Sequence, residues 1–210
     1  MNKQLTIVVS CDGQKTSVNS IKLLFYQKID CQIVVLNLSN DEITKQRLLD
    51  YQKQSHQVIK IVEENSKVED YIKTPYVLFM KCDTIITDKN LLRRCIESMH
   101  RRSLDLVTVK LIAKNGYSKY YRIFEFFRDR VLSNFPTCTN SFMMYRSDVA
   151  KNNRIYDTCH DLDQSIKLSR AIDKNKFAVV KGKVATSEEV FKNYGKYYLT
   201  IKLFSNWIHR

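Results

Sequence analysis

Short apolar segments alternate with helical segments over the first 83 residues, and this alternation limits the possible folds more than any other feature. The apolar segments are rich in β-branched residues and show little polar alternation, which is typical of strands buried on both faces. We expect strands at Leu5–Ser10, Gln32–Leu38, Gln57–Val62 and Val77–Met80, and helices at Ser17–Lys28, Glu42–Gln54 and Ser66–Lys73. Regular alternation of this kind predicts a parallel, doubly wound sheet with helices on both faces.

The rest of the chain continues with helices and strands of the same kinds. We expect helices at Asp88–Arg101, Tyr117–Asn134, Asp161–Ile172 and Tyr197–Ile208, and strands at Leu106–Ile112, Ser141–Tyr145 and Phe177–Lys181. A chain of 210 residues is long enough for one domain with a sizeable core. The predicted fold class is therefore α/β, a single-domain, three-layer α/β/α sandwich around a mostly parallel sheet.

Composition narrows the class of protein without choosing a function. The net charge of +13 predicts an anionic partner, either nucleic acid, an anionic membrane surface or a phosphorylated substrate, or else serves solubility alone. The six cysteines occur singly and form no C-x-x-C pair, which disfavours a zinc site and predicts buried thiols. No apolar run approaches the roughly 18 residues of a membrane-spanning helix, and no signal peptide precedes the first strand, so we expect a cytoplasmic protein.

Polar side chains follow three of the expected strands, at the edge where parallel strands end. Asp12 follows the first strand, Asn37 ends the second, and Asp83 follows Val77–Met80. Ligands of open α/β sheets bind in the crevice at this edge. Each residue also has a structural interpretation: Asp12 and Asp83 suit turns, Asp83 could cap the helix near Asp88, and Asn37 could satisfy the strand end. Neither a G-x-G-x-x-G nor a P-loop motif is present.

Several segments, in their order and spacing, resemble the family 2 glycosyltransferases, which have the GT-A fold. Ser20–Leu24 with Gln27 resembles the helix after the family's first strand, and Ile33–Asp41 stands where that family has a strand ending in Asp-Asp-Gly-Ser. Tyr76–Thr84 resembles the strand that ends in the Asp-x-Asp motif. Asn140–Arg146 resembles the acceptor-side strand, and Ile155–Asp157 followed by His160–Asp163 resembles the Phe-Asp-Glu and Glu-Asp elements.

This resemblance implies an inverting transfer of a sugar from a nucleotide-diphosphate donor, with a UDP-sugar favoured, to a hydroxyl of a glycan or lipid-linked acceptor. It implies a divalent cation, Mn²⁺ or Mg²⁺, bound by Asp83, and a general base at Asp161. The implied nucleotide contacts are Ser10, Asp12, Asn37, Lys81 and Cys82. The implied acceptor-side residues are Asn140, Arg146, His160 and Asp163. The nucleotide-binding half would span residues 1–84, the acceptor-side half 85–190, and a C-terminal amphipathic helix 191–210.

The sequence departs from the family pattern at three places. Lys81 replaces the first carboxylate of Asp-x-Asp, Leu36 and Asn37 replace Asp-Asp, and His160 stands where a Glu is usual. Lys81 either weakens metal binding or contacts the diphosphate as a point charge. The departures keep open a second reading, an inactive relative that only binds a nucleotide or a sugar. A basic nucleic-acid-binding domain is a third, supported by charge alone, and we expect no nucleic-acid partner.

Two further residue assignments have alternatives. Asp161 stands at the start of an expected helix, where a carboxylate is a favourable N-cap whatever its chemistry. Asp163 could instead be the cap, or the base.

The expected helix Tyr197–Ile208 has one apolar face with basic residues beside it. That face either packs onto the domain, which we favour, or makes peripheral contact with a membrane.

Overall fold

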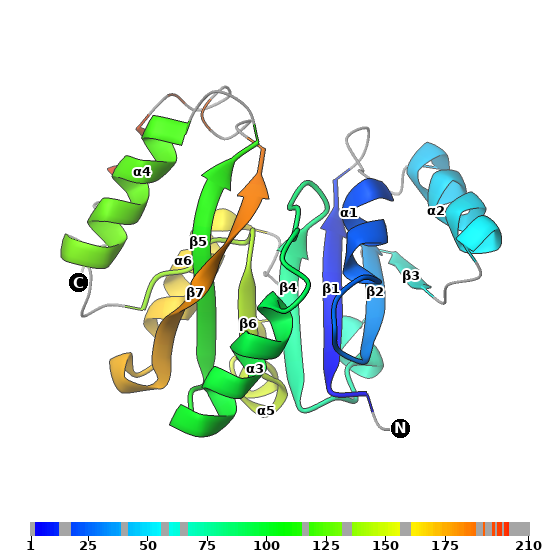
Figure 1. The fold of residues 1–210 in the computed structure, drawn as a ribbon. Helices are drawn as coiled ribbons and strands as arrows, with labels where there is room; N and C mark the ends of the chain where they lie inside the picture. The colour runs from blue at the N-terminus through cyan, green and yellow to red at the C-terminus, as the bar shows by residue number, and fades with distance from the viewer. Residues whose placement is uncertain are drawn as a thin grey trace.

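The computed structural model describes residues 3–12, 18–38, 42–55, 59–63, 67–114, 118–131, 136–155, 161–187, 191, 195, 197–198 and 200–201. Figure 1 shows a central sheet with α1 (Val18–Leu24) and α3 (Leu91–Arg102) on the near face. On the far face lie α5 (Ser147–Asn152) and α6 (Leu162–Arg170). This arrangement confirms the predicted α/β fold with three layers.

Seven strands form one sheet in the described part of the chain, in the order β3-β2-β1-β4-β6-β5-β7. The strands are β1 (Leu5–Cys11), β2 (Cys31–Asn37), β3 (Ile59–Glu63), β4 (Tyr76–Lys81), β5 (Leu106–Ala113), β6 (Met143–Arg146) and β7 (Phe177–Thr186). Only β6 runs antiparallel to both of its neighbours, β4 and β5. The amino end of β6 therefore faces the same edge of the sheet as the carboxyl ends of the other six strands.

Other helices with defined bounds in the described ranges are α2 (Glu42–Ser55), α4 (Ser118–Phe126) and the short 3₁₀ helices Val68–Tyr71 and Lys174–Lys176. After Phe126 the chain continues in a π-helical turn, Phe127–Val131. The expected helix Ser66–Lys73 is thus a single 3₁₀ turn among the described residues, and α5 was not anticipated. No helix in the described ranges is long and apolar enough to cross a bilayer.

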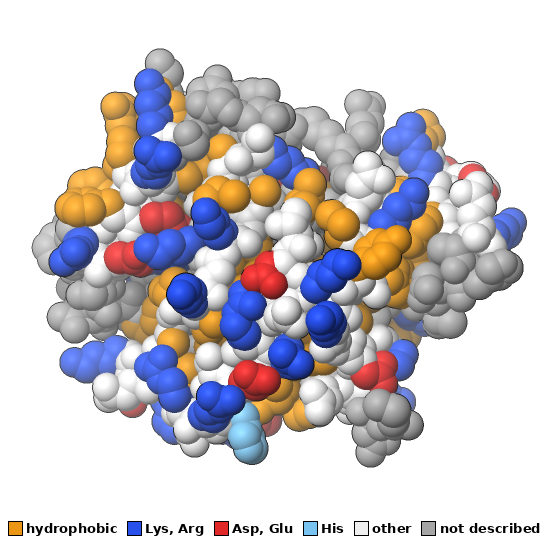
Figure 2. Space-filling view, viewed as in Figure 1, with side chains coloured by type: hydrophobic (Ala, Val, Ile, Leu, Met, Phe, Trp, Pro, Cys, Tyr) orange, Lys and Arg blue, Asp and Glu red, His pale blue; other side chains and the backbone are white. Residues whose placement is uncertain are grey.

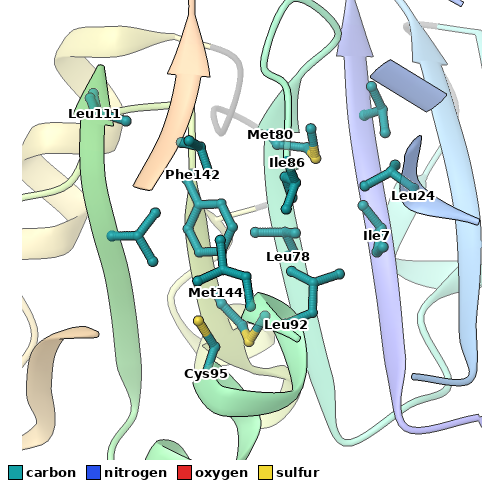
Figure 3. Close-up of a cluster of buried hydrophobic side chains, with 14 of the residues drawn as sticks. Ile7, Leu24, Leu78, Met80, Ile86, Leu92, Cys95, Leu111, Phe142 and Met144 are labelled. Atoms are coloured by element: carbon teal, nitrogen blue, oxygen red, sulfur yellow. The ribbon is translucent and has the colours of Figure 1, made fainter. Parts of the chain in front are cut away.

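The core consists of two apolar layers, one on each face of the sheet, and β4 contributes to both. Leu78 and Met80 point to the layer that contains α3, whereas Val77 and Phe79 belong to the opposite layer. Figure 3 shows Leu78 and Met80 among side chains from β1, α3 and β6, including Ile7, Leu92 and Met144. All four apolar residues of β4 are 0–1% exposed, which confirms that this strand is buried on both faces.

The cysteines of the described residues are free thiols, and all but Cys31, which is half-buried, are buried as expected. Cys95 and Cys138 are fully buried. Burial raises the pKa of each of these thiols to about 12. Neither is therefore a ready thiolate nucleophile at neutral pH. Cys159 lies outside the described residues.

Strand β7 extends five residues beyond its expected end at Lys181, up to Thr186. Its polar segment Lys181–Lys183 lies where the pairing of β5 with β7 shifts register. Gly182 lies against α3, and a Cβ added there would meet Leu91 Cδ1 at 2.3 Å. A glycine at this position lets the strand pass close to the helix and carry Thr186 to the carboxyl edge.

Two charged side chains hold α4 on β5. β5 pairs with β6 at Leu106 and Val107. Further along β5, the Leu111 amide donates to Glu125 Oε1 at 2.9 Å. Arg128 donates to the Val109 carbonyl at 3.3 Å and forms a close ion pair with Glu125. Both side chains are buried. They therefore satisfy backbone groups of β5 that a neighbouring strand would otherwise bond.

The C-terminal residues are described only in part. Tyr197 packs its ring at 5.9 Å from the ring of Tyr120 in α4, and Tyr198 packs against the core. Tyr197 and Ile201 of the apolar face nevertheless remain 54% and 62% exposed, so the packing of that face onto the domain stays a prediction. Residues 202–210 lie outside the described residues.

We predict that Arg128→Met lowers the free energy of unfolding by about 3 kcal/mol or more at pH 7, because it leaves Glu125 buried without its countercharge. Burial raises the pKa of Glu125 and the charge of Arg128 opposes this rise, so the folded variant should keep the Glu125 proton to a higher pH than the folded wild type does. The deficit should therefore shrink as the pH falls toward 4.5, the ordinary value for this carboxyl. Urea unfolding of variant and wild type at several pH values measures it.

The double variant Glu125→Gln/Arg128→Met is the control. It removes both charges, so its own free energy of unfolding should change less between pH 7 and pH 4.5 than that of Arg128→Met, which still carries Glu125. A deficit of Arg128→Met that stays constant from pH 7 to pH 4.5 would contradict the assignment.

Candidate active site

The carboxyl edge of β1, β2 and β4 brings together five of the residues that the sequence placed at a nucleotide. In the register of the sheet Ser10 lies beside Lys81, and Cys11 lies beside Asn37. The Cys82 amide donates to the Ser10 carbonyl at 2.9 Å, which continues the β1–β4 ladder past the strand end. Ser10, Asp12, Asn37, Lys81 and Cys82 thus occupy one edge of three adjacent strands.

Lys81 and Asp12 form an ion pair across this edge. The Lys81 ammonium lies 3.8 Å from Asp12 Oδ2, and the two side chains are 28% and 55% exposed. An ion pair this exposed contributes little to stability. Its importance is therefore positional, because it places a positive charge at the end of β4.

Asn37 is fully buried. Its amide donates to Glu63 Oε2 at 3.4 Å, and Glu63 in turn pairs with Lys45 of α2 at 3.2 Å. This bond links the ends of β2 and β3, as the structural interpretation of Asn37 anticipates. Its contact with a nucleobase stays a prediction.

Asp83 lies in a turn directly after β4, closed by the Thr84 amide donating to the Lys81 carbonyl at 3.0 Å. Its carboxylate accepts hydrogen bonds from the hydroxyl of the next residue and from two hydroxyls at the end of β7. Thr186 Oγ1 and Thr84 Oγ1 each lie 3.5 Å from Oδ1, and Ser187 Oγ donates closely to Oδ2. The end of β7 therefore orients Asp83, although Ser187 lies 104 residues after Asp83 in the sequence.

The helix cap proposed for Asp83 is not what the structure shows. α3 begins at Leu91 with Asn90 as its N-cap residue. Asp88 accepts from the Asn90 amide at 2.9 Å and pairs with Arg94 at 2.5 Å. The hydrogen bond from Arg94 lowers the pKa of Asp88. Because Asp88 supports the start of α3, Asp83 is not needed there.

Sequence reasoning missed the residues of β7 and α4 that support Asp83. Ser141 lies 3.4 Å from Thr186 between the hydroxyl oxygens, and Tyr121 donates to the Ser187 carbonyl at 2.8 Å. The backbone pairing of Ile85 with Ala185 holds the two segments together. Nothing in the sequence marks these contacts, because Ser and Thr at a strand end are ordinary turn residues.

Asp161 is the N-cap residue of α6, and its Oδ1 accepts from the Gln164 amide at 2.7 Å. This observation decides between the two candidates for the cap, because Asp163 lies inside the first turn of the helix. α6 leads into β7, which starts at the opposite edge of the sheet. The amino end of α6 is therefore directed toward the edge that carries Asp83.

The other acceptor-side residues are divided. Asn140 is buried just before β6, at the same edge as Asp83. Arg146 ends β6 beside Tyr76, the first residue of β4, and pairs with Asp105 and Asp148. It therefore lies at the opposite edge, because β6 is antiparallel to β4, and we leave it out of the candidate site. His160 lies outside the described residues.

The described residues fit a divalent cation only if a ligand shares its coordination. They include no group of three or more His, Cys, Asp or Glu side chains that could hold a metal ion. Asp83 supplies one hard carboxylate with hydroxyls around it. Mg²⁺ is commonly bound by one or two carboxylates with substrate phosphates and water, and carboxylate, carbonyl and water ligands also suit Mn²⁺. The residues fit such a shared site and not an all-protein cage.

The fold is that of known GT-A-type glycosyltransferases. A mannosyltransferase from Pyrobaculum calidifontis, solved with GDP-Man and Mn²⁺, superposes with a TM-score of 0.70 at 10% identity over 100% of this chain. Glucosyl-3-phosphoglycerate synthase from Mycobacterium tuberculosis, solved with Mn²⁺, UDP-glucose and phosphoglyceric acid, superposes with a TM-score of 0.56 at 10% identity over 97% of this chain. Mannosyl-3-phosphoglycerate synthase from Rubrobacter xylanophilus superposes with a TM-score of 0.55 at 9% identity over 95% of this chain.

The chain spans 65% of the mannosyltransferase, 79% of the glucosyl-3-phosphoglycerate synthase and 72% of the mannosyl-3-phosphoglycerate synthase. No protein-family model matches the sequence, and no curated protein sequence matches it. At about 10% identity the likeness establishes the architecture. The chain therefore has the GT-A-type fold, and its own chemistry has to be argued from its residues.

We predict that Asp161→Ala lowers the free energy of unfolding by about 1 kcal/mol, because the substitution removes the N-cap of α6. Asp161→Asn should change it by only a few tenths, since Asn caps helices about as well as Asp. Chemical denaturation of both variants measures the difference. Equal losses in the two variants would show that the charge of Asp161, and not its cap, stabilises the fold.

Proposed function

We propose that this protein is an inverting glycosyltransferase that moves a sugar from a nucleotide-diphosphate donor to an acceptor hydroxyl. The observation that carries the proposal is the position of Asp83. It follows the central strand at the carboxyl edge of a GT-A-type sheet, and the hydroxyls of Thr186 and Ser187 at the end of β7 orient it. Ligands of such sheets bind at this edge.

Asp83 would hold a divalent cation together with the donor diphosphate. A bound Mn²⁺ or Mg²⁺ would neutralise the negative charge that develops on the departing nucleoside diphosphate. The hydrogen bond from Ser187 would keep the carboxylate pointing in one direction, because its Oδ2 is already engaged. This preorganisation matters, since a fixed charge loses no energy in turning toward the leaving group during the reaction.

Asp161 would be the general base for the acceptor hydroxyl. As the N-cap of α6 it has one oxygen bound to the Gln164 amide, and its side chain lies at the protein surface. Such a carboxylate is held in place by the helix and can still reach a bound acceptor. Removal of the hydroxyl proton as the oxygen attacks the anomeric carbon would give inversion in a single displacement.

The described residues leave the donor base open between uracil and guanine. The sequence favoured a UDP-sugar, but Asn37 is buried and bonded to Glu63. The fold neighbours include proteins solved with UDP-glucose and with GDP-mannose. We propose a glycan or lipid-linked acceptor, and a phosphoglycerate acceptor is the alternative that these neighbours suggest.

Positive charge is consistent with a phosphorylated ligand but does not define the site. Figure 2 shows Lys and Arg side chains spread over the face that carries α3 and β7, with a few acidic side chains among them. The excess charge is distributed over this face and does not converge on one groove. We therefore do not assign the function from net charge.

The proposal predicts Mn²⁺- or Mg²⁺-stimulated release of nucleoside diphosphate from one of UDP-glucose, UDP-N-acetylglucosamine or GDP-mannose. Asp83→Asn and Asp161→Asn should each lower kcat by about 10²–10⁴-fold, the range expected for groups that act on the reacting atoms. A coupled assay for released UDP or GDP, with a panel of sugar and lipid-phosphate acceptors, measures the rates.

Asp70→Asn is the matched control, because Asp70 is an exposed carboxylate in the 3₁₀ turn Val68–Tyr71. It should keep the wild-type rate. Full activity of Asp83→Asn, or donor turnover that does not depend on Asp161, would contradict the assigned roles.

A further inference from the structure

Lys81 is a cation at a position where the sequence resemblance leads one to expect a carboxylate. It ends β4, two residues before Asp83, and its side chain is 28% exposed. The backbone around it is bonded on every side. The Cys82 amide donates to Ser10, the Thr84 amide donates to Lys81, and Ser20 Oγ donates to the Cys82 carbonyl at 2.5 Å. The backbone that carries the Lys81 side chain is therefore held rigidly at the site.

Among the described residues the Lys81 ammonium forms an ion pair with Asp12, at 3.8 Å. This is longer than a good charge-assisted hydrogen bond, which is about 2.7–2.9 Å. The Asp12 carboxylate is also more than half exposed, so water and salt weaken its hold. A phosphate oxygen that reached the ammonium at hydrogen-bond distance would compete successfully with Asp12.

From this arrangement we infer that Lys81 binds the diphosphate directly and that Asp12 is its counter-ion in the unliganded protein. The inference rests on the proposed function, because it concerns the same nucleotide site. Its consequence is specific to this chain. Part of the charge neutralisation comes from a fixed ammonium, so nucleoside diphosphate binding has a component that needs no metal ion.

The types of residue present explain how a metal ion and an ammonium group can share the neutralisation of the diphosphate. A divalent cation at Asp83 and an ammonium at Lys81 can both lie against the same diphosphate, because that group has several charged oxygens. A second carboxylate at position 81 would instead repel the diphosphate in the absence of a cation. Compared with a carboxylate at position 81, Lys81 thus weakens cation binding and adds a direct bond to phosphate.

The test is calorimetric titration of UDP and of GDP into the full chain, at constant ionic strength, once with EDTA and once with Mn²⁺. The wild type should bind one of the two nucleotides in EDTA. Lys81→Met should weaken that metal-free binding about tenfold to a hundredfold, which is the contribution expected of a bond between charged groups. Lys151→Met, an exposed charge loss on α5, should bind as the wild type does.

Two further variants test the parts of the inference separately. Asp12→Asn should strengthen metal-free binding several-fold, because Lys81 loses its competing partner; weaker binding would overturn the counter-ion role. Lys81→Asp should bind no nucleotide in EDTA and show the largest gain on addition of Mn²⁺. Thermal unfolding of each unliganded variant verifies that the fold is intact.

The outcomes separate this inference from the proposed function. If the wild type binds a nucleotide only with Mn²⁺, or if Lys81→Met binds equally well in EDTA, the inference is wrong and the transferase proposal stands. If neither nucleotide binds under any condition, the proposed function itself is wrong.

Discussion

The burial of β4 on both faces is the constraint on which the rest of the molecule depends. Its four apolar residues connect the two core layers, and its edges pair with β1 on one side and β6 on the other. A strand enclosed in this way can present polar groups to a ligand only where it ends. Lys81 and Asp83 occupy that end, so the packing that stabilises the sheet also places the candidate chemistry.

The candidate site joins the two halves of the sheet. Asp83 follows β4, whereas the hydroxyls that orient it belong to Thr186 and Ser187 at the far end of the sheet order. Strand β7 reaches Asp83 because Gly182 lets it pass close to α3. Ser187 is in turn held by Tyr121 of α4, and α4 is held on β5 by Glu125 and Arg128. A continuous set of contacts thus connects a buried ion pair to the carboxylate at the candidate site.

Local pattern was sufficient for most of the strands and for the residues adjacent to them. The strands before Asp12, Asn37 and Asp83 are apolar runs whose burial follows from composition, and a parallel sheet places their ends together whatever else the chain does. The N-cap at Asp161 was likewise visible, because a carboxylate at a helix start has a local partner in the third amide of the helix. Arg146 was misplaced, since direction in a sheet is not encoded in a four-residue strand.

The sequence by itself determined the α/β architecture, the edge at which polar residues gather and the presence of Lys81 where the resemblance leads one to expect a carboxylate. Only the tertiary structure decided that Ser187 donates to Asp83, that Asn37 donates to Glu63 and that Asp12 pairs with Lys81. The physical reason is range. Strand and helix patterns arise from neighbours a few residues apart, whereas these contacts depend on strand order, register and a close approach at one glycine, which no local pattern records.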